Sequence, residues 1–259
     1  LMLFTKQYTS LKSTGLFSSL FEDYINQSSQ VKPFYNHHIN KTDFSAYLDN
    51  NKFDYLNRSV LVKALQTQAI LTSNTASTSF ANIQLLENNN TFTITTGHQL
   101  CLFTGPLYFI YKIASTINLC KSLKDNFSDK NFVPVYWMAS EDHDFEEIRH
   151  YSFLGKSYTW ETNQQGPVGR FSTRGISALD RQMRMEAHRE PALQALFDLF
   201  EASYSDTDLA TATRKVVHQL FGHYGLLILD ADDHRLKSSF AGIMAKDISE
   251  GNSFRLVSK

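Results

Sequence analysis

Residues 91–147 constrain the possible folds of this chain more than any other stretch, because two strand-like runs flank one helix-like run. The first run, TFTIT before Gly97, is β-branched and aromatic, as strands require. After Pro106, apolar residues recur at helical spacing. The run FVPVYWMA at 132–139 is almost continuously apolar, which is typical of a strand buried on both faces of a parallel sheet. The order strand, helix, strand therefore predicts an α/β fold built on a parallel sheet.

Two polar loops follow these predicted strands. They are Gly97-His98-Gln99 and Glu141-Asp142-His143-Asp144. Open parallel sheets bind their ligands outside the carboxyl ends of their strands, and both loops fall at such ends. The sequence therefore predicts an active site where the two loops meet.

The first loop has features that suit an anionic ligand. Gly97 would let the backbone turn tightly and approach a ligand closely. Thr104 and Gly105 lie near the start of the predicted helix, whose unpaired N–H groups and dipole favour phosphate or carboxylate. Lys112 could reach the same anion from further along the helix. The alternative is that Gly97 is a simple turn, and that His98 and Lys112 are surface residues.

The second loop places four titratable side chains in succession, and three roles suit it. Carboxylates are ligands for Mg²⁺, whereas imidazole with carboxylate suits zinc or iron. His143 starts near neutrality and could act as a general acid or base. Asp142 and Asp144 could instead hold an amine cation. The alternative is an acidic first turn of a helix, which is our interpretation of Glu146 and Glu147.

A third strand is predicted at LLILD, residues 226–230, and it ends at Asp230. Helices are predicted before and after it, the first capped within 206–208 and the second by Asp233. Because ligands bind outside the carboxyl ends of parallel strands, the Asp230 side chain would face the crevice formed by the two earlier loops. We therefore expect Asp230 to join the site.

The loops also carry a family resemblance. TTGHQLCLFTGPLYFIYK followed by PVYWMASEDHDFEEI resembles the BshC family of bacillithiol biosynthesis proteins, the cysteine-adding enzymes. KPFYN near residue 35, GPVGRF at 166–171 and FGHYGLLILDADDHRLK at 221–237 fall in the expected order. The resemblance covers essentially the whole chain, but only about the first half of a usual family member. Such proteins resemble class I aminoacyl-tRNA synthetase cores, which implies a Rossmann-like sheet here.

The resemblance also implies a reaction, namely amide formation between cysteine and the amine of glucosaminyl malate. ATP or another nucleotide would be the cosubstrate that activates the carboxylate, with Mg²⁺ as a possible companion. His98, Gln99 and Thr104 would hold phosphates, as the histidine-rich signature of the synthetases does. The acidic loop, including Glu141, would hold Mg²⁺ or the amino group, and His143 would accept a proton. Two other functions remain open, a nucleotide- or sugar-phosphate-binding module without catalysis and a metal-dependent hydrolase.

The sequence suggests four segments. Residues 1–90 are expected to form a helical segment packed on the core, and 91–150 the first Rossmann-like βαβ unit. Residues 151–206 would be a small α+β connective insertion that opens with a β-meander at 151–171. Residues 207–259 would form a third strand–helix unit. We expect a truncated chain, because family members continue with further strands and a coiled coil that could form a homodimer.

Charge and composition narrow the partners. A formal net charge of −1 and a pI of about 6.8 give no general attraction to nucleic acid or to anionic membranes. No apolar run approaches the ~20 residues that span a bilayer. Cys101 and Cys120, the two cysteines, fit a reducing compartment better than a disulfide scaffold. We therefore expect a cytoplasmic protein that acts on small molecules.

Overall fold

The computed structural model describes residues 5, 7–38, 41–50, 55–70, 76–187 and 190–258. The chain divides into two compact units, Leu1–Phe53 and Asp54–Lys259. The first unit is helical where it is described, with α1 (Leu11–Thr14), α2 (Ser19–Ile25), the 3-10 helix η1 (Lys32–Phe34) and α3 (Lys41–Asn50). The serine side chains of Ser10 and Ser18 cap the first two helices, each accepting an amide hydrogen three residues on.

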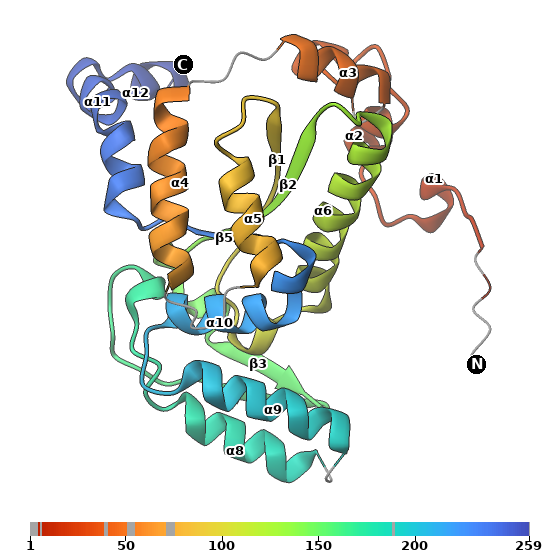
Figure 1. Cartoon of the computed structure of the whole chain (residues 1–259). Helices are drawn as coiled ribbons and strands as arrows, with labels where there is room; N and C mark the ends of the chain where they lie inside the picture. Colours follow the sequence, from red (N-terminus) through yellow and green to blue (C-terminus); the bar gives the residue numbers. More distant parts are fainter. Residues whose placement is uncertain are drawn as a thin grey trace. The chain divides into compact units, whose positions relative to one another are not determined.

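The second unit is built on a parallel sheet of three strands in the order β1-β2-β5 (Figure 1). The strands are β1 (Thr91–His98), β2 (Asn131–Met138) and β5 (Leu227–Asp230). Helix α6 (Leu107–Asn126) connects β1 to β2, as the sequence predicts. The expected α/β class and the Rossmann-like parallel sheet are therefore confirmed.

Two layers of helices cover the two faces of the sheet. One core cluster joins Val133, Val135, Leu227 and Leu229 of the strands to helices α4 (Tyr55–Ile70) and α5 (Ser77–Leu85). The other face packs Tyr136, Met138 and Ile228 against α6 and α10 (Leu209–Phe221). Successive strand residues point to opposite faces. The continuous apolar runs of β2 and β5 follow from this, because both faces are buried.

Pro134 lies within β2 although proline cannot donate a ladder hydrogen bond. It pairs with Ile94 of β1, and the pairing with β5 begins only at Val135. The proline thus precedes the stretch in which β2 is paired on both edges, and the sheet tolerates it there.

The segment between β2 and α10 differs in part from its prediction. It contains α7 (Phe145–Ile148), the antiparallel pair β3 (His150–Phe153) and β4 (Lys156–Thr159), η3 (Val168–Arg170), α8 (Ile176–Glu186) and α9 (Pro191–Tyr204). Pro191 lies in the first turn of α9. The β-meander at 151–171 is wrong beyond β4. The backbone amides of Val168 and Gly169 bond to the loop after β2 instead of to a third antiparallel strand.

This segment shares one hydrophobic core with the α6 and α10 face of the sheet. Trp160, Phe171 and Phe200 belong to the same cluster of buried residues as Phe109 and Val216. In Figure 1, α8 and α9 lie beside one another next to α10. The segment boundaries that we expect at residues 90, 150 and 206 stay predictions.

The predicted helix caps around β5 are confirmed. Asp208 accepts the amide hydrogen of Thr211 at 2.8 Å and begins α10, and Asp233 accepts that of Arg235 at 2.9 Å and begins α11 (His234–Glu250). The 3-10 helix η4 (Gly222–Tyr224) leads into β5, and α12 (Asn252–Val257) follows α11. Within the described ranges, none of the helices combines the length and the apolar character that crossing a bilayer requires.

The packing of α6 gives a first prediction. Ile113 is fully buried against the sheet, whereas Leu107 on the same helix is 65% exposed. We expect Ile113→Ala to lower the free energy of unfolding by roughly 2–5 kcal/mol through lost burial and a residual cavity. Leu107→Ala should change it by less than about 0.5 kcal/mol. Urea unfolding of both variants checks this, and equal losses would contradict the assigned face.

Candidate active site

The carboxyl ends of the three strands meet at one edge of the sheet. His98 of β1 pairs with Met138 of β2, and Met138 pairs with Asp230 of β5. The loop after β2 is tied to the end of β1, because the amide of Ala139 donates to the carbonyl oxygen of His98 at 3.1 Å. The loops that carry the predicted site residues therefore lie next to one another.

Gln99 connects the first loop directly to the acidic loop. Its side-chain amide donates to a carboxylate oxygen of Asp142 at 2.9 Å and also to Glu147. Glu147 lies in α7, and the sequence assigned it only to the helix dipole. The structure adds it to the site as the second carboxylate beside Gln99.

The carboxylates of this edge differ in how they are neutralised. Lys237 forms ion pairs with Glu141 at 2.9 Å and with Asp232 at 2.5 Å, and Arg170 also pairs with Asp232. In the part of the chain that the structure describes, no ion pair reaches Asp142 or Glu147. These two carboxylates therefore form a net negative patch beside a neutral amide, which is the electrostatic setting that an ammonium group needs.

The loop conformation favours the charged form of Asp142. The amide of Asp144 donates to its carboxylate at 2.9 Å, and this bond and that from Gln99 hold the pKa of Asp142 below its usual range. Asp144 caps α7 by accepting the amide hydrogen of Glu147 at 3.3 Å. His143 is exposed at the tip of the loop, with its charge close enough to lower the Asp142 pKa further. This cap is a structural role for Asp144, and the catalytic roles of Asp142, His143 and Asp144 stay predictions.

His98 lies inward from the loop, between the rings of Tyr108 and Phe109 at 5.1 and 5.2 Å. Its Nδ1 contacts the carbonyl oxygen of Gln99 at 3.0 Å, so Nδ1 is the nitrogen that carries the proton. Burial lowers the pKa of His98, which keeps the ring neutral at pH 7. Its Nε2 is then an acceptor, buried with no partner among the described residues.

The expectation that Gly97 makes a tight turn is wrong. Gly97 is a paired strand residue opposite Trp137, and a Cβ added there would meet nothing of the described chain closer than 3.7 Å. The tight turn lies at Phe103, Thr104 and Gly105, which all have positive φ, within and after the 3-10 helix η2 (Leu102–Thr104). At Gly105 a Cβ would lie 2.4 Å from the Cβ of Cys101, so only glycine fits.

Helix α6 begins at Leu107, directly after this turn. Its N-cap residue, Pro106, provides no side-chain hydrogen bond, and the amide of Phe109 donates to the carbonyl oxygen of Pro106 at 2.9 Å. The ammonium group of Lys112 donates to the carbonyl oxygen of Gly97 and lies 5.3 Å from the ring centre of Tyr108. Lys112 therefore stabilises the end of β1, and contact with a ligand stays a prediction.

Asp230 faces the loop after β2, as expected. Its carboxylate accepts hydrogen bonds from the hydroxyl of Ser140 and from the amide of Asp232. Gln68 of α4 holds the Asp230 backbone from the other side, accepting from its amide at 2.9 Å and donating to its carbonyl oxygen at 3.2 Å. Asp230 thus joins the sheet to the acidic loop.

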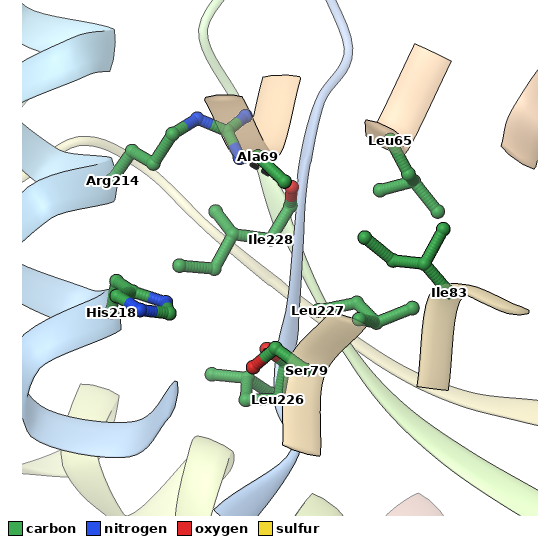
Figure 2. A pocket seen from close by; sticks show the side chains of 9 residues that line it. All are labelled: Leu65, Ala69, Ser79, Ile83, Arg214, His218, Leu226, Leu227 and Ile228. Atoms are coloured by element: carbon green, nitrogen blue, oxygen red, sulfur yellow. Dashed lines mark hydrogen bonds between the residues drawn. The ribbon is translucent and has the colours of Figure 1, made fainter. Parts of the chain in front are cut away.

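The fully buried Arg214 supports this strand end from behind. Figure 2 shows its guanidinium next to Ile228, whose carbonyl oxygen accepts from it at 2.8 Å. A second bond of 2.9 Å runs from Arg214 to the side-chain oxygen of Gln68. The small cavity in Figure 2, about 20 Å³ between β5 and helices α4, α5 and α10, lies behind the strand and not at its carboxyl end. It belongs to the support of the site.

The loop GPVGRF holds the acidic loop in place. The amides of Val168 and Gly169 donate to the carbonyl oxygens of Asp142 at 2.7 Å and Ser140 at 2.9 Å. A Cβ at Gly169 would lie 2.6 Å from the carbonyl oxygen of Ser140, so the close approach requires glycine. Sequence reasoning gave this loop no role at the site. Its two glycines beside an arginine were the only available signal.

A metal centre is not built into this arrangement. Throughout the described ranges, no three or more His, Cys, Asp or Glu side chains gather in a way that could hold an ion. The acidic residues are spread between ion pairs, a helix cap and the Gln99 contact.

The sheet and its polar carboxyl edge define a Rossmann-like α/β domain whose site is assembled from loops of all three strands. The family described as Bacillithiol biosynthesis BshC, N-terminal Rossmann-like domain, matches residues 4–259. The chain therefore belongs to the BshC family.

Curated relatives of this chain carry the name of the same family. A protein of Flavobacterium johnsoniae named "Putative cysteine ligase BshC" is 45% identical over 251 residues, which cover 96% of this chain and 47% of that protein. A protein of the same name from Cytophaga hutchinsonii is 42% identical over 250 residues, covering 95% and 45%. One from Staphylococcus epidermidis is 29% identical over 252 residues, covering 89% and 45%. The chain spans about half the length of these relatives.

The contact at Gly169 can be tested by adding one methyl group. We expect Gly169→Ala to lower the free energy of unfolding by about 1–3 kcal/mol, because the new Cβ forces Ser140 away. Gly242→Ala is the matched control. Outside the backbone of its own helix, no atom of the described residues lies within 4 Å of its Cβ position on α11, so there alanine should stabilise slightly. Urea unfolding measures both, and a harmless Gly169→Ala would contradict the described packing.

The cap of α11 predicts a pH dependence. Hydrogen bonds from the side chain of Arg235, and then from Gln68, hold the pKa of Asp233 far below its usual range, although burial opposes this. Because the folded state has the lower pKa, the unfolded state takes up the proton first as the pH falls. The stabilisation is fully present above about pH 4 and is lost at lower pH.

We therefore expect Asp233→Asn to lower the stability at pH 7 and to flatten its decline below about pH 4, although asparagine retains the cap. Urea unfolding from pH 7 downward measures this. Asp129→Asn, at a carboxylate that is 72% exposed, serves as the control. An unchanged pH profile for Asp233→Asn would show that the Arg235 contact has no effect on folding.

Proposed function

We propose that this chain forms the activating half of a ligase that joins the carboxylate of cysteine to the amine of glucosaminyl malate. The relatives are named cysteine ligases, and the family description places them in bacillithiol biosynthesis. The observation that supports the proposal most is the meeting of Gln99 with Asp142 and Glu147 at the carboxyl edge of the sheet. The negative patch there suits the α-ammonium group of an amino acid.

The reaction needs activation, because a carboxylate has a poor leaving group. In the proposed first step, a carboxylate oxygen of cysteine attacks a phosphorus atom of ATP. This gives an acyl-adenylate with release of pyrophosphate, or an acyl-phosphate with release of ADP. The turn at 103–105 and the uncapped amides of α6 are suited to the phosphate charge. Thr104, Gly105 and His98 border this region.

In the second step, the glucosamine nitrogen attacks the activated carbonyl carbon. The bond from carbon to the phosphate oxygen breaks, AMP or phosphate leaves, and one amine proton is transferred. His143 is exposed at the edge and is the proposed acceptor. Mg²⁺ would be held mainly by the phosphates with one or two carboxylates, since no larger protein donor set is present among the described residues.

The alternatives are less well supported by the geometry. A metal-dependent hydrolase needs a set of protein ligands, which the described residues do not assemble. A binding module without catalysis would use the same phosphate region but leaves Asp142, Glu147 and His143 without a purpose. Activity in the cytoplasm and dimerisation through a coiled coil stay parts of the proposal.

The test is product formation by the complete gene product that carries this sequence. It is incubated with cysteine, glucosaminyl malate and ATP, and the products are weighed by mass spectrometry. We expect bacillithiol, with AMP and pyrophosphate or ADP and phosphate identifying the activated species. Product formation without a nucleotide would refute the activation step.

Alanine variants then test the residues. Asp142→Ala and His143→Ala should abolish bacillithiol formation while the protein stays folded, because both side chains lie at the surface of the edge. Circular dichroism and urea unfolding control for structure. Asp129→Ala, in an exposed turn before the opposite end of β2, should retain full activity. Normal turnover in the Asp142 or His143 variant would remove that residue from the mechanism.

A further inference from the structure

A small cavity beneath the Gln99 loop has no part in the mechanism described so far. Its volume is about 10 Å³, which is room for about one water-sized group. The loop after β1, the first turn of α6, strand β2 and helices α9 and α10 enclose it. Gln99 is one of the residues that line it, and its side chain also contacts the negative patch.

Thr213 of α10 lines this cavity with a hydroxyl that lacks a hydrogen-bond partner among the described residues. The residue is 6% exposed, as is Thr116 of α6. Thr116 shows the usual arrangement in a helix, donating to the carbonyl oxygen of Lys112 at 2.9 Å. A buried hydroxyl that makes no such bond is costly and points to a ligand group beside it.

The other walls of the cavity are neutral or apolar. Phe109, Val216 and Val217 are apolar, and Thr104 is neutral. Burial raises the pKa of the Cys101 thiol and of the Tyr136 and Tyr204 hydroxyls, so that all three stay protonated. A charged group would lose its hydration here without gaining a partner. A single neutral group fits, namely a methyl, a hydroxyl or a thiol. A thiol suits both kinds of wall, because it behaves as a small hydrophobe with a weak donor.

Gln99 supplies the second half of the proposed recognition site. Gln99 touches the cavity and donates to both Asp142 and Glu147. A small amino acid with its side chain in the cavity would therefore carry its α-ammonium group towards the two carboxylates. We propose that this cavity is the side-chain subsite for a small neutral α-amino acid, with the thiol of cysteine beside the Thr213 hydroxyl.

This inference rests on the proposed function and names the residues that select its amino acid. The test measures the binding of two amino acids to the full-length protein by calorimetry under reducing conditions. They are L-cysteine and L-2-aminobutyrate, in which a methyl group replaces the thiol. Thr213→Val keeps the size of the side chain and removes the hydroxyl. It should weaken binding of L-cysteine about three- to tenfold and leave L-2-aminobutyrate unchanged. Thr116→Val, equally buried, is the matched control and should change neither.

A second variant does not depend on the hydroxyl. Val217→Ala enlarges the cavity, so it should allow binding of L-norvaline, which the native protein should exclude. If Thr213→Val retains the native preference, or if a crystal with L-cysteine shows only water in the cavity, the subsite is wrong while the proposed function stands. If the native protein binds no L-cysteine at millimolar concentration, with or without ATP, both are wrong.

Discussion

The pairing of β2 along both of its edges is the constraint on which the rest of the structure depends. Strand β1 pairs with it from Asn131 to Met138, and β5 pairs with it from Val135 to Met138. A slip of one residue would turn Tyr136 and Met138 to the face that α4 and α5 cover, and their side chains do not match that space. Since the register cannot move, the positions of the loops at the carboxyl edge are fixed as well. Gln99 meets Asp142 for this reason.

Contacts from the surrounding helices and loops then fix the side chains at the strand ends. Arg214 and Gln68 satisfy the backbone at the end of β5 from behind, which leaves the Asp230 side chain directed to the loop after β2. In the loop at 166–171, the amides of Val168 and Gly169 donate hydrogen bonds to the loop after β2. The approach at Gly169 is too close for any residue but glycine. The acidic residues are therefore held by backbone contacts, and their charges need not hold the loop together. Asp142 and Glu147 have no ion-pair partner among the described residues, and a ligand contact there stays a proposal.

The three strands and the helix caps around β5 could be predicted from the sequence, because apolar periodicity and capping residues act over a few positions. The runs TFTIT, FVPVYWMA and LLILD are all strands, and Asp208 and Asp233 are both caps. The contacts of Glu147 and Gly169 could not be predicted, because each joins residues far apart in the sequence and depends on the finished register. The turn was placed at Gly97 for a related reason. Gly97 and Gly105 both lie between the predicted strand and the predicted helix, and only the strand pairing of Gly97 and the positive φ of Gly105 distinguish them. The nucleotide, Mg²⁺, the coiled-coil dimer and the compartment stay predictions.

The single hydrophobic cluster that runs from α6 and β2 through Trp160 and Phe200 has a consequence for motion. Elements that share buried side chains open together, since exposing one part of a common core exposes the rest. The region between β2 and α10 therefore cannot swing as an independent lid. The rates of hydrogen exchange in α9 and α10 should therefore change together with that of β2, and the loop at 99–105 should follow them, because Leu100, Leu102 and Phe103 lie in the same buried cluster.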